Sequence, residues 1–230
     1  DEVRFAVRED VQILRDPLPT DPLLIGLPDE ADLTVRAARL LQAACGTRLG
    51  AGIHVTKRIP AGGGLGGGSS DAAAVLLALN DLWDLGWSRE RLAGLGAQLG
   101  ADVPVFVHGR NAFATGRGDV IEPVILPARW FLILHPGVSV STAEVFNDTQ
   151  LTRDTPARRI PAVPPGGGHN DCEPVARRRY PEVAAALDWL GARAPARLTG
   201  TGACVFAAFD SAGQARAAAA ATLSDPSEPA

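Results

Sequence analysis

The segment Ile59–Ala74, IPAGGGLGGGSSDAAA, places six glycines within seven positions directly before an alanine-rich run. Glycine reaches left-handed backbone conformations, but it loses more conformational entropy on folding than any other residue. The segment before the glycines, GIHVTKRIP, has the pattern of a β-strand that ends at Pro60, and the segment after them is apolar enough for a buried helix. The fold must therefore accommodate a strand, a glycine loop (Gly62–Gly68) and a buried helix in direct succession.

Two established kinds of glycine-rich segment are compatible with part of this pattern. A flexible linker is one, although this loop stands between a strand and an apolar helix. Gly62, Gly64 and Gly67 also match the Gly-x-Gly-x-x-Gly fingerprint of dinucleotide-binding folds. That fingerprint requires an acidic residue at the end of a second strand about 20 positions on. Asp81, the acidic residue in that region, falls within a helical pattern instead.

A Walker A loop requires Gly-Lys-Ser/Thr at the start of the helix, whereas this chain has Gly68-Ser69-Ser70. All such loops share the same physics, because glycine N–H groups and the N-terminus of the following helix both attract anions. The partial charge of the helix contributes only about 0.3–1 kcal/mol, so several amide hydrogen bonds must supply most of the affinity. We therefore expect a polyphosphate ligand. Ser69 and Ser70 are predicted to cap the helix or to direct hydroxyls at phosphate or Mg²⁺.

The composition of the 230 residues disfavours several classes of protein. The net charge is −4 and no basic stripe is present, so a nucleic-acid partner is not expected. Cys45, Cys172 and Cys204 are far apart and lack the spacing of a zinc site or a disulfide framework, which is typical of a reducing cytoplasm. No run approaches the roughly 18 apolar residues of a membrane span. We expect a cytoplasmic protein with no membrane partner and no protein metal cluster.

The hydrophobic periodicity predicts an α+β fold, because helices and strands are mixed without strict βαβ repetition. Helices are predicted over 33–45 between a cap at Asp32 and a stop at Gly46, over 69–83, over 88–100, over 171–179, over 182–193 and after Ser211. Strands are predicted as a pair within 3–14, over 52–60, throughout 101–124, over 129–137 and as a strand, turn and strand over 196–210. The Pro-rich and Gly-rich segment 151–168 is predicted to be a long connection or lid.

The loop sequence PAGGGLGGGSSDAA resembles the phosphate loop of the GHMP kinases. Together with LGADVPVFVHG, HPGVSVST and LTGTGACVFAAF, which follow in order, it resembles the branch of that family that acts on cytidyl-diphospho-methylerythritol. The resemblance implies a small-molecule kinase that uses ATP and Mg²⁺ to phosphorylate the 2-hydroxyl of this substrate in non-mevalonate isoprenoid synthesis. It also implies two lobes, a ribosomal S5 domain 2-like ATP-binding lobe over 1–125 and a ferredoxin-like lobe over 126–230.

The resemblance carries residue roles onto this chain. The ATP-site residues it implies are Lys57, Pro60, Ala61, Gly62, Gly63, Gly64, Leu65, Gly66, Gly67, Gly68, Ser69 and Ser70. Lys57 would lie near the adenine, although as a strand residue it could equally face solvent. Asp102 in GADVP would be the catalytic residue that accepts the hydroxyl proton, a role that contributes roughly 10²–10⁴-fold to rate. From the residues alone, Asp102 could instead form a turn or cap a helix.

Substrate contacts are implied for Thr142 and Phe146 in STAEVF, with the phenyl ring stacked on the cytosine. Phe146 could instead be an ordinary core residue. The segment Thr199–Cys204, TGTGAC, resembles the family motif that supports the phosphate loop, and its alternative is a simple hairpin turn.

The chain departs from the family at its beginning. The family starts with a PAKLNL-like strand, whose lysine pairs with the catalytic aspartate, and continues with a Gly-Tyr-His segment that holds the cytidine. Neither occurs in this sequence. We therefore expect the N-terminal strands to be missing and this piece to have little activity. Asp32 also stands where the family usually has Asn. The alternative functions are another GHMP small-molecule kinase and a nucleotide-binding relative without activity.

Overall fold

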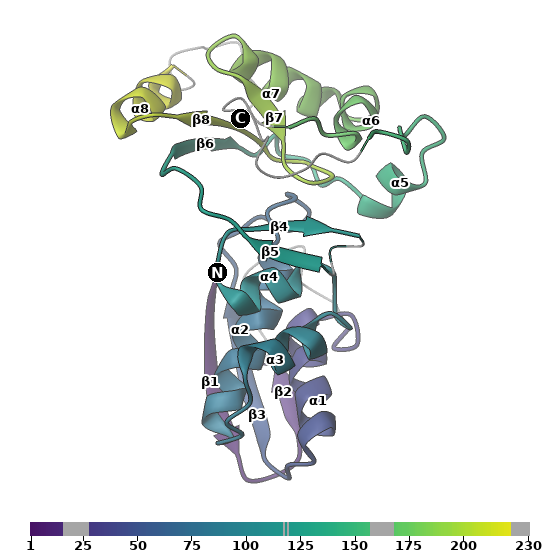
Figure 1. Cartoon of the computed structure of the whole chain (residues 1–230), viewed down its shortest axis with the longest axis vertical. Coiled ribbons are helices and arrows are strands. Elements are labelled where there is room, and N and C mark those ends of the chain that lie inside the picture. The colour runs from purple at the N-terminus through teal and green to yellow at the C-terminus, as the bar shows by residue number, and fades with distance from the viewer. Residues whose placement is uncertain (16–27, 117, 119, 157–167, 222–230) are drawn as a thin grey trace. The chain divides into compact units, whose positions relative to one another are not determined.

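The computed structural model describes residues 1–15, 28–116, 118, 120–156 and 168–221. These residues form two compact units, each with its own hydrophobic core (Figure 1). The first unit comprises Asp1–Ala61 and Gly66–Leu126, and the second comprises Gly62–Leu65 and Pro127–Ala230. Both units combine helices with antiparallel strands, which confirms the predicted α+β class.

The described part of the first unit contains a mixed sheet and a separate hairpin. Its strands are β1 (Glu2–Arg8), β2 (Ile13–Arg15), β3 (Gly50–Thr56), β4 (Ala112–Thr115) and β5 (Val120–Pro123). The sheet order is β1-β3-β2, with β3 antiparallel to β1 and parallel to β2. The prediction of a strand pair within 3–14 is therefore wrong in its pairing, because each strand pairs with β3. Glycine at position 50 lets the segment before β2 lie close against the start of β3, since a Cβ there would lie 2.2 Å from the carbonyl oxygen of Gln12.

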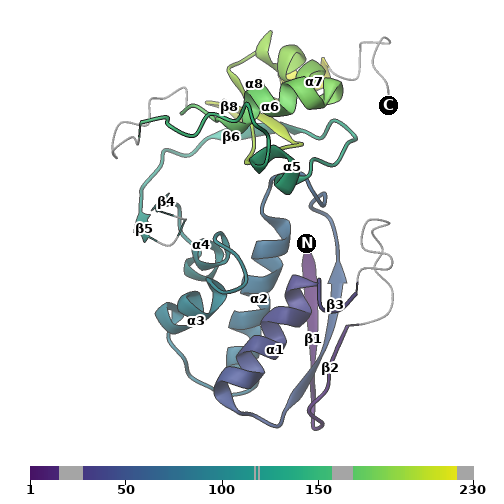
Figure 2. The same ribbon diagram turned by 90° about the vertical axis from the view of Figure 1, so that its right-hand side faces the viewer.

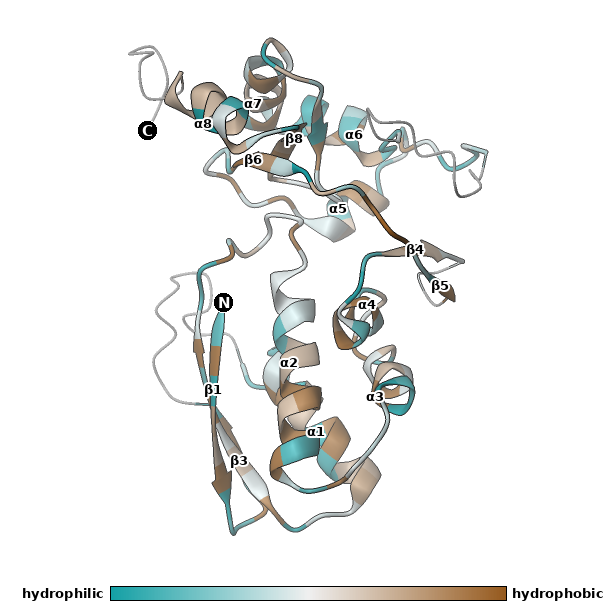
Figure 3. Ribbon diagram, turned by 60° about the vertical axis from the view of Figure 1, so that its left-hand side comes forward, coloured by the Kyte–Doolittle hydropathy of each residue, from teal (hydrophilic) through white to brown (hydrophobic). Residues whose placement is uncertain are grey.

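Four helices pack in the described part of this unit, α1 (Leu33–Cys45), α2 (Gly67–Leu82), α3 (Arg89–Gly96) and α4 (Val103–His108). The limits predicted for α1 are confirmed. The Asp32 carboxylate accepts a hydrogen bond from the Thr34 N–H at 2.8 Å, and Gly46 ends the helix with φ 70°. Helices α1 and α2 lie side by side on one face of the sheet (Figure 2). Their hydrophobic stretches, brown in Figure 3, supply much of the core.

The segment 101–124 forms strands only in its second half. Its first half is helix α4, which corrects the prediction of strands throughout. Pro104 lies in the first turn of α4, where the missing N–H removes no helical hydrogen bond. Val103 and Val107 are four residues apart and fully buried. The alternating valines therefore fit one face of a short helix as well as they fit a strand.

The second unit is built on the antiparallel sheet β6-β8-β7, formed by β6 (Trp130–Leu134), β7 (Ala196–Leu198) and β8 (Val205–Phe209). Its helices are α5 (Thr142–Phe146), α6 (Cys172–Arg179), α7 (Pro181–Gly191) and α8 (Ala212–Ala220). The predicted strands and the three predicted helices of this unit are confirmed, while α5 was not predicted. Most of the predicted lid, residues 157–167, lies outside the described residues.

Candidate active site

The glycine loop uses its freedom of conformation at three alternate positions. Gly62, Gly64 and Gly66 have φ angles of 71°, 72° and 70°, in the left-handed region that other residues rarely adopt. At Gly64 the space is also closed, because a Cβ would lie 2.4 Å from the carbonyl oxygen of Thr199 and 2.8 Å from that of Gly202. Both conformation and close approach therefore require glycine at this position.

Helix α2 begins at Gly67, with Gly66 as its N-cap and no capping hydrogen bond from a side chain. The prediction that Ser69 or Ser70 caps the helix is wrong, because the helix starts before either serine. The Ser70 hydroxyl instead donates to the carbonyl oxygen of Gly67 at 2.8 Å. Within the described part of the chain, no side-chain cap occupies the N–H groups of the first turn, which is the arrangement that binds anions at helix N-termini.

Lys57 lies just before the loop in a buried cluster of charges. Its ammonium is 2.9 Å from the Asp71 carboxylate and also pairs with the Asp1 carboxylate. The three side chains are at most 7% exposed, so Lys57 does not face solvent. Because Lys57 precedes the glycine loop and Asp71 follows it on α2, this ion pair joins the two ends of the loop.

Asp102 occupies the N-cap position of α4 with an exposed side chain that makes no capping hydrogen bond. The structure therefore gives no support to the capping alternative. Helix α4 is also packed on the loop, because a Cβ at Gly66 would lie 2.8 Å from the ring of Phe106. The helix that presents Asp102 and the residue that opens α2 are thus held in contact within the first unit.

In the second unit, Gly62–Leu65 lie on the segment Thr199–Cys204, here termed the support loop. The N–H of Ala203 donates to Gly62 and the N–H of Cys204 donates to Gly63, both at 3.0 Å. The Thr199 hydroxyl also donates to the Gly63 carbonyl at 2.8 Å. The support loop is therefore more than a hairpin turn, since it holds the carbonyl groups of the glycine loop.

The predicted substrate residues lie on the short helix α5. The hydroxyls of Thr142 and Thr201 are 3.0 Å apart, so α5 is tied to the tip of the support loop. Phe146, at the end of α5, is 52% exposed. The core-packing alternative for Phe146 is therefore wrong, and its ring is free to contact a ligand.

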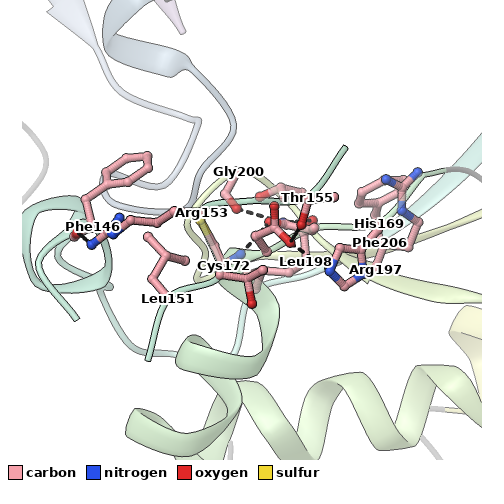
Figure 4. Close-up of a pocket in the computed structure, with 14 residues that line it drawn as sticks. Phe146, Leu151, Arg153, Thr155, His169, Cys172, Arg197, Leu198, Gly200 and Phe206 are labelled. Carbon is pink, nitrogen blue, oxygen red and sulfur yellow. Dashed lines mark hydrogen bonds and ion pairs between the residues drawn. The ribbon is translucent and has the colours of Figure 1, made fainter. Parts of the chain in front are cut away.

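A cavity of about 800 Å³ lies beside α5 in the second unit (Figure 4). Phe146 and Arg153 lie at one end of the group of lining residues and Arg197 at the other. Arg153 donates to the Phe146 carbonyl at 2.6 Å, which fixes the end of α5. Arg153 and Arg197 were not predicted, although Arg197 stands immediately before LTGTGAC in the sequence.

The described residues offer neither a cluster of metal ligands nor a membrane span. No group of three histidine, cysteine or acidic side chains that could hold a metal ion occurs among them. Likewise, none of the helices in the described ranges is long and apolar enough to cross a membrane.

Comparison with known proteins shows the class of protein to which this chain belongs. Residues 32–110 match the GHMP kinases N terminal domain, and residues 166–225 match the GHMP kinases C terminal family. The crystal structure of L. major mevalonate kinase in complex with R-mevalonate matches with a TM-score of 0.63. It covers 98% of this chain and 82% of that chain at 15% identity, which supports the fold alone. The chain is a GHMP kinase with the two-lobed α+β fold of that class.

More similar relatives define the family within this class. The 4-diphosphocytidyl-2-C-methyl-D-erythritol kinase of Alkalilimnicola ehrlichii is 57% identical over 95% of this chain and 73% of the relative. A crystal structure of 4-(cytidine 5'-diphospho)-2C-methyl-D-erythritol kinase has a TM-score of 0.76 and 32% identity, covering 95% of this chain and 81% of that chain. The chain belongs to the family of 4-diphosphocytidyl-2-C-methyl-D-erythritol kinases.

Proposed function

We propose that the product of the gene that encodes this chain catalyses ATP-dependent phosphorylation of the 2-hydroxyl of 4-diphosphocytidyl-2-C-methyl-D-erythritol, a step of non-mevalonate isoprenoid synthesis. The observation that carries this proposal is the 57% identity, over 95% of the chain, to a relative named for that kinase. The loop geometry agrees with it, because glycines in left-handed conformations precede a helix N-terminus that no side chain caps.

The nucleotide site is proposed along the loop, from Pro60 to Ser70. Backbone N–H groups and the start of α2 would bind the phosphates of ATP. We propose that Lys57 serves this site by joining the loop ends through Asp71, at a distance of 2.9 Å.

Mg²⁺ is proposed to enter with the nucleotide, since this ion is usually held by substrate phosphates, waters and one or two protein oxygens. The Ser70 hydroxyl donates to Gly67, which leaves its oxygen lone pairs for a cation, so its chemistry fits such a role. When bound, Mg²⁺ would neutralise charge on the phosphates during transfer.

The reaction is proposed to follow from Asp102 and the loop. The Asp102 carboxylate accepts the proton of the substrate 2-hydroxyl as that oxygen forms a bond to the γ-phosphorus of ATP. The bond from this phosphorus to the β–γ bridging oxygen breaks, and ADP leaves with the bonding electrons. Thr142 and Phe146 are proposed to hold the substrate, Phe146 by stacking on the cytosine.

The proposed partner is this small molecule, and the proposed location is the cytoplasm. The location is supported by the three cysteines, all of which are free thiols.

A panel of alcohols tests the proposal. The complete product of the gene that encodes this chain is incubated with ATP, Mg²⁺ and either the cytidyl substrate, homoserine or mevalonate, and ADP release is measured. We expect kcat/KM for the cytidyl substrate to exceed that for the other two alcohols by at least about 10⁴-fold, because a site that pairs polar groups of its substrate rejects ligands lacking them. Preference for homoserine or mevalonate would assign another GHMP kinase activity, and failure with all three would favour a binding protein.

A further inference from the structure

The support loop, Thr199–Cys204, contacts both of the ligand-binding elements proposed in the second unit. On one side it holds the glycine loop, through bonds from Thr199 and Cys204 to the Gly63 carbonyl at 2.8 and 3.0 Å. On the other side the Thr201 hydroxyl lies 3.0 Å from that of Thr142 on α5. A displacement of this loop would therefore move the phosphate-binding backbone and the substrate helix together.

One side chain outside the loop fixes its first residues. The Asn170 amide nitrogen donates to the carbonyl oxygens of Leu198 at 3.1 Å and Gly200 at 2.8 Å, which flank Thr199 on both sides. Its amide oxygen accepts the N–H of Cys172, the first residue of α6, at 3.0 Å. The two donors face carbonyl groups and the acceptor faces an N–H, so only one orientation of the amide fits.

The contacts around Thr199 leave little room for adjustment. Its N–H donates to the Cys204 carbonyl at 2.9 Å, and its own carbonyl accepts the Gly202 N–H at 2.7 Å. A Cβ at Gly200 would lie 3.4 Å from the Gly64 carbonyl oxygen, so the space between the two loops admits little more than a methyl group. Moving the carbonyls of residues 198 and 200 would consequently shift the groups that hold Gly63.

We infer that Asn170 is a positioning residue that couples the nucleotide side and the alcohol side of the site through the support loop. This inference rests on the proposed function, which puts phosphate on the glycine loop and the cytidyl alcohol on α5. Asn170 also lines the cavity beside α5, and its hydrogen bonds tie the support loop to the start of α6. Because a displacement of about 1 Å can cost about 10²-fold in rate, loss of its two donors weakens both sides at once.

The variant Asn170→Asp tests the coupling. Its carboxylate keeps an acceptor for the Cys172 N–H but turns a negative oxygen toward the Leu198 and Gly200 carbonyls. In the complete gene product we expect KM for ATP and KM for the cytidyl alcohol each to rise by at least about 10-fold. The matched control is Asn111→Asp, which makes the same change at an exposed residue before β4 and leaves both constants within about two-fold.

Two further variants separate the nucleotide side of the site from the alcohol side. Thr199→Val removes the hydroxyl that bonds Gly63 and is expected to raise KM for ATP alone. Thr201→Val removes the hydroxyl that meets Thr142 and is expected to raise KM for the alcohol alone. In the double variant of Asn170 and Thr199, the effects on KM for ATP are expected to fall short of their product, because both act through one loop.

A lower melting temperature with both KM values unchanged in Asn170→Asp would show a purely structural role and overturn the inference. A change in only one KM would overturn the coupling. If Asn170→Asp does not fold, Asn170→Ala carries the same readouts without the added charge. Binding of a non-hydrolysable ATP analogue, measured by titration calorimetry without alcohol, tests the nucleotide half even if the cytidyl alcohol is not the substrate.

Discussion

At the scale of single residues, the glycine loop shows what sequence can and cannot reveal. Its place between a strand and a helix predicts several left-handed glycines, and Gly62, Gly64 and Gly66 adopt that conformation. The sequence carried no sign that Gly64 must also be small. That requirement comes from Thr199, a residue brought to the loop only by the fold.

Gly64→Ala tests this double requirement. We expect it to raise KM for ATP by at least about 10-fold, because the methyl group collides with backbone oxygens of the support loop. Gly46→Ala is the control, since Gly46 also has φ 70° but a Cβ added there would have no atom within 4 Å. It should lower the free energy of unfolding by about 1 kcal/mol and leave KM unchanged. Equal effects on KM in the two variants would refute the close-approach explanation.

Asp102→Asn tests the proposed base. An amide cannot accept the hydroxyl proton, so we expect kcat to fall by about 10²–10⁴-fold while KM for ATP changes by less than about three-fold. Single-turnover kinetics in the complete gene product measure this split. Asp84→Asn, at another exposed aspartate of the first unit, is the control and should retain full turnover. Unchanged kcat in Asp102→Asn would remove Asp102 from the mechanism.

At the scale of elements, local signals succeeded where a cap or a stop residue marks the end of a helix. Helix α1 follows its prediction from Asp32 to Gly46 for this reason. The pattern failed for α4, whose six residues are too few to distinguish a helical period from alternation. It also failed for the pairing of β1 and β2, because sequence adjacency favours a hairpin and the chain instead places β3 between them.

Lys57, which follows β3, pairs with Asp71 of α2, and we expect substitution of Lys57 to lower the stability of the protein. Lys57→Met leaves the buried carboxylates of Asp1 and Asp71 without their cation, so we expect the free energy of unfolding to fall by about 3 kcal/mol. Arg58→Met is the matched control, because Arg58 is 71% exposed and its pair with Glu2 is worth less than about 1 kcal/mol. Denaturant titration measures both. A loss of ATP affinity with no loss of stability in Lys57→Met would favour a direct adenine contact instead.

Asp148, in the turn after α5, is expected to make the stability of the protein depend on pH in acid. The hydrogen bond from the Gln150 N–H, followed by those from Arg179 and Arg178, holds the pKa of Asp148 at about 2, below its ordinary value of 3.8. A lowered pKa in the folded state gives stability that is complete above about pH 4 and is lost as the pH falls toward about 2.

Thermal melts of the wild type and Asp148→Asn check this dependence. We expect the difference between their melting temperatures to be constant near neutral pH and to shrink between pH 4 and 2, since the variant lacks the titrating carboxylate. Asp188→Asn, in the exposed pair with Arg177, is the control. The difference between its melting temperature and that of the wild type should change little with pH. A difference that stays constant down to pH 2 would contradict the assignment.

At the scale of the whole molecule, the sequence motifs indicated the family, the α+β class and the proposed site residues, since each motif is a short local pattern. They did not indicate Asn170, whose importance arises from contacts with the support loop about 30 positions away. The bond from Thr199 to Gly63 spans 136 positions. Such contacts depend on the packing of a complete unit and leave no periodic signal in the chain.

The proposed reaction transfers the γ-phosphoryl group of ATP to one hydroxyl of 4-diphosphocytidyl-2-C-methyl-D-erythritol. Phosphorus-31 NMR of the compound made by the complete gene product identifies this transfer, because coupling to carbon locates the new phosphate. We expect a single new phosphomonoester on C2 together with an equal amount of ADP. A phosphate on another carbon, or ADP formed without any new ester on the cytidyl substrate, would contradict it.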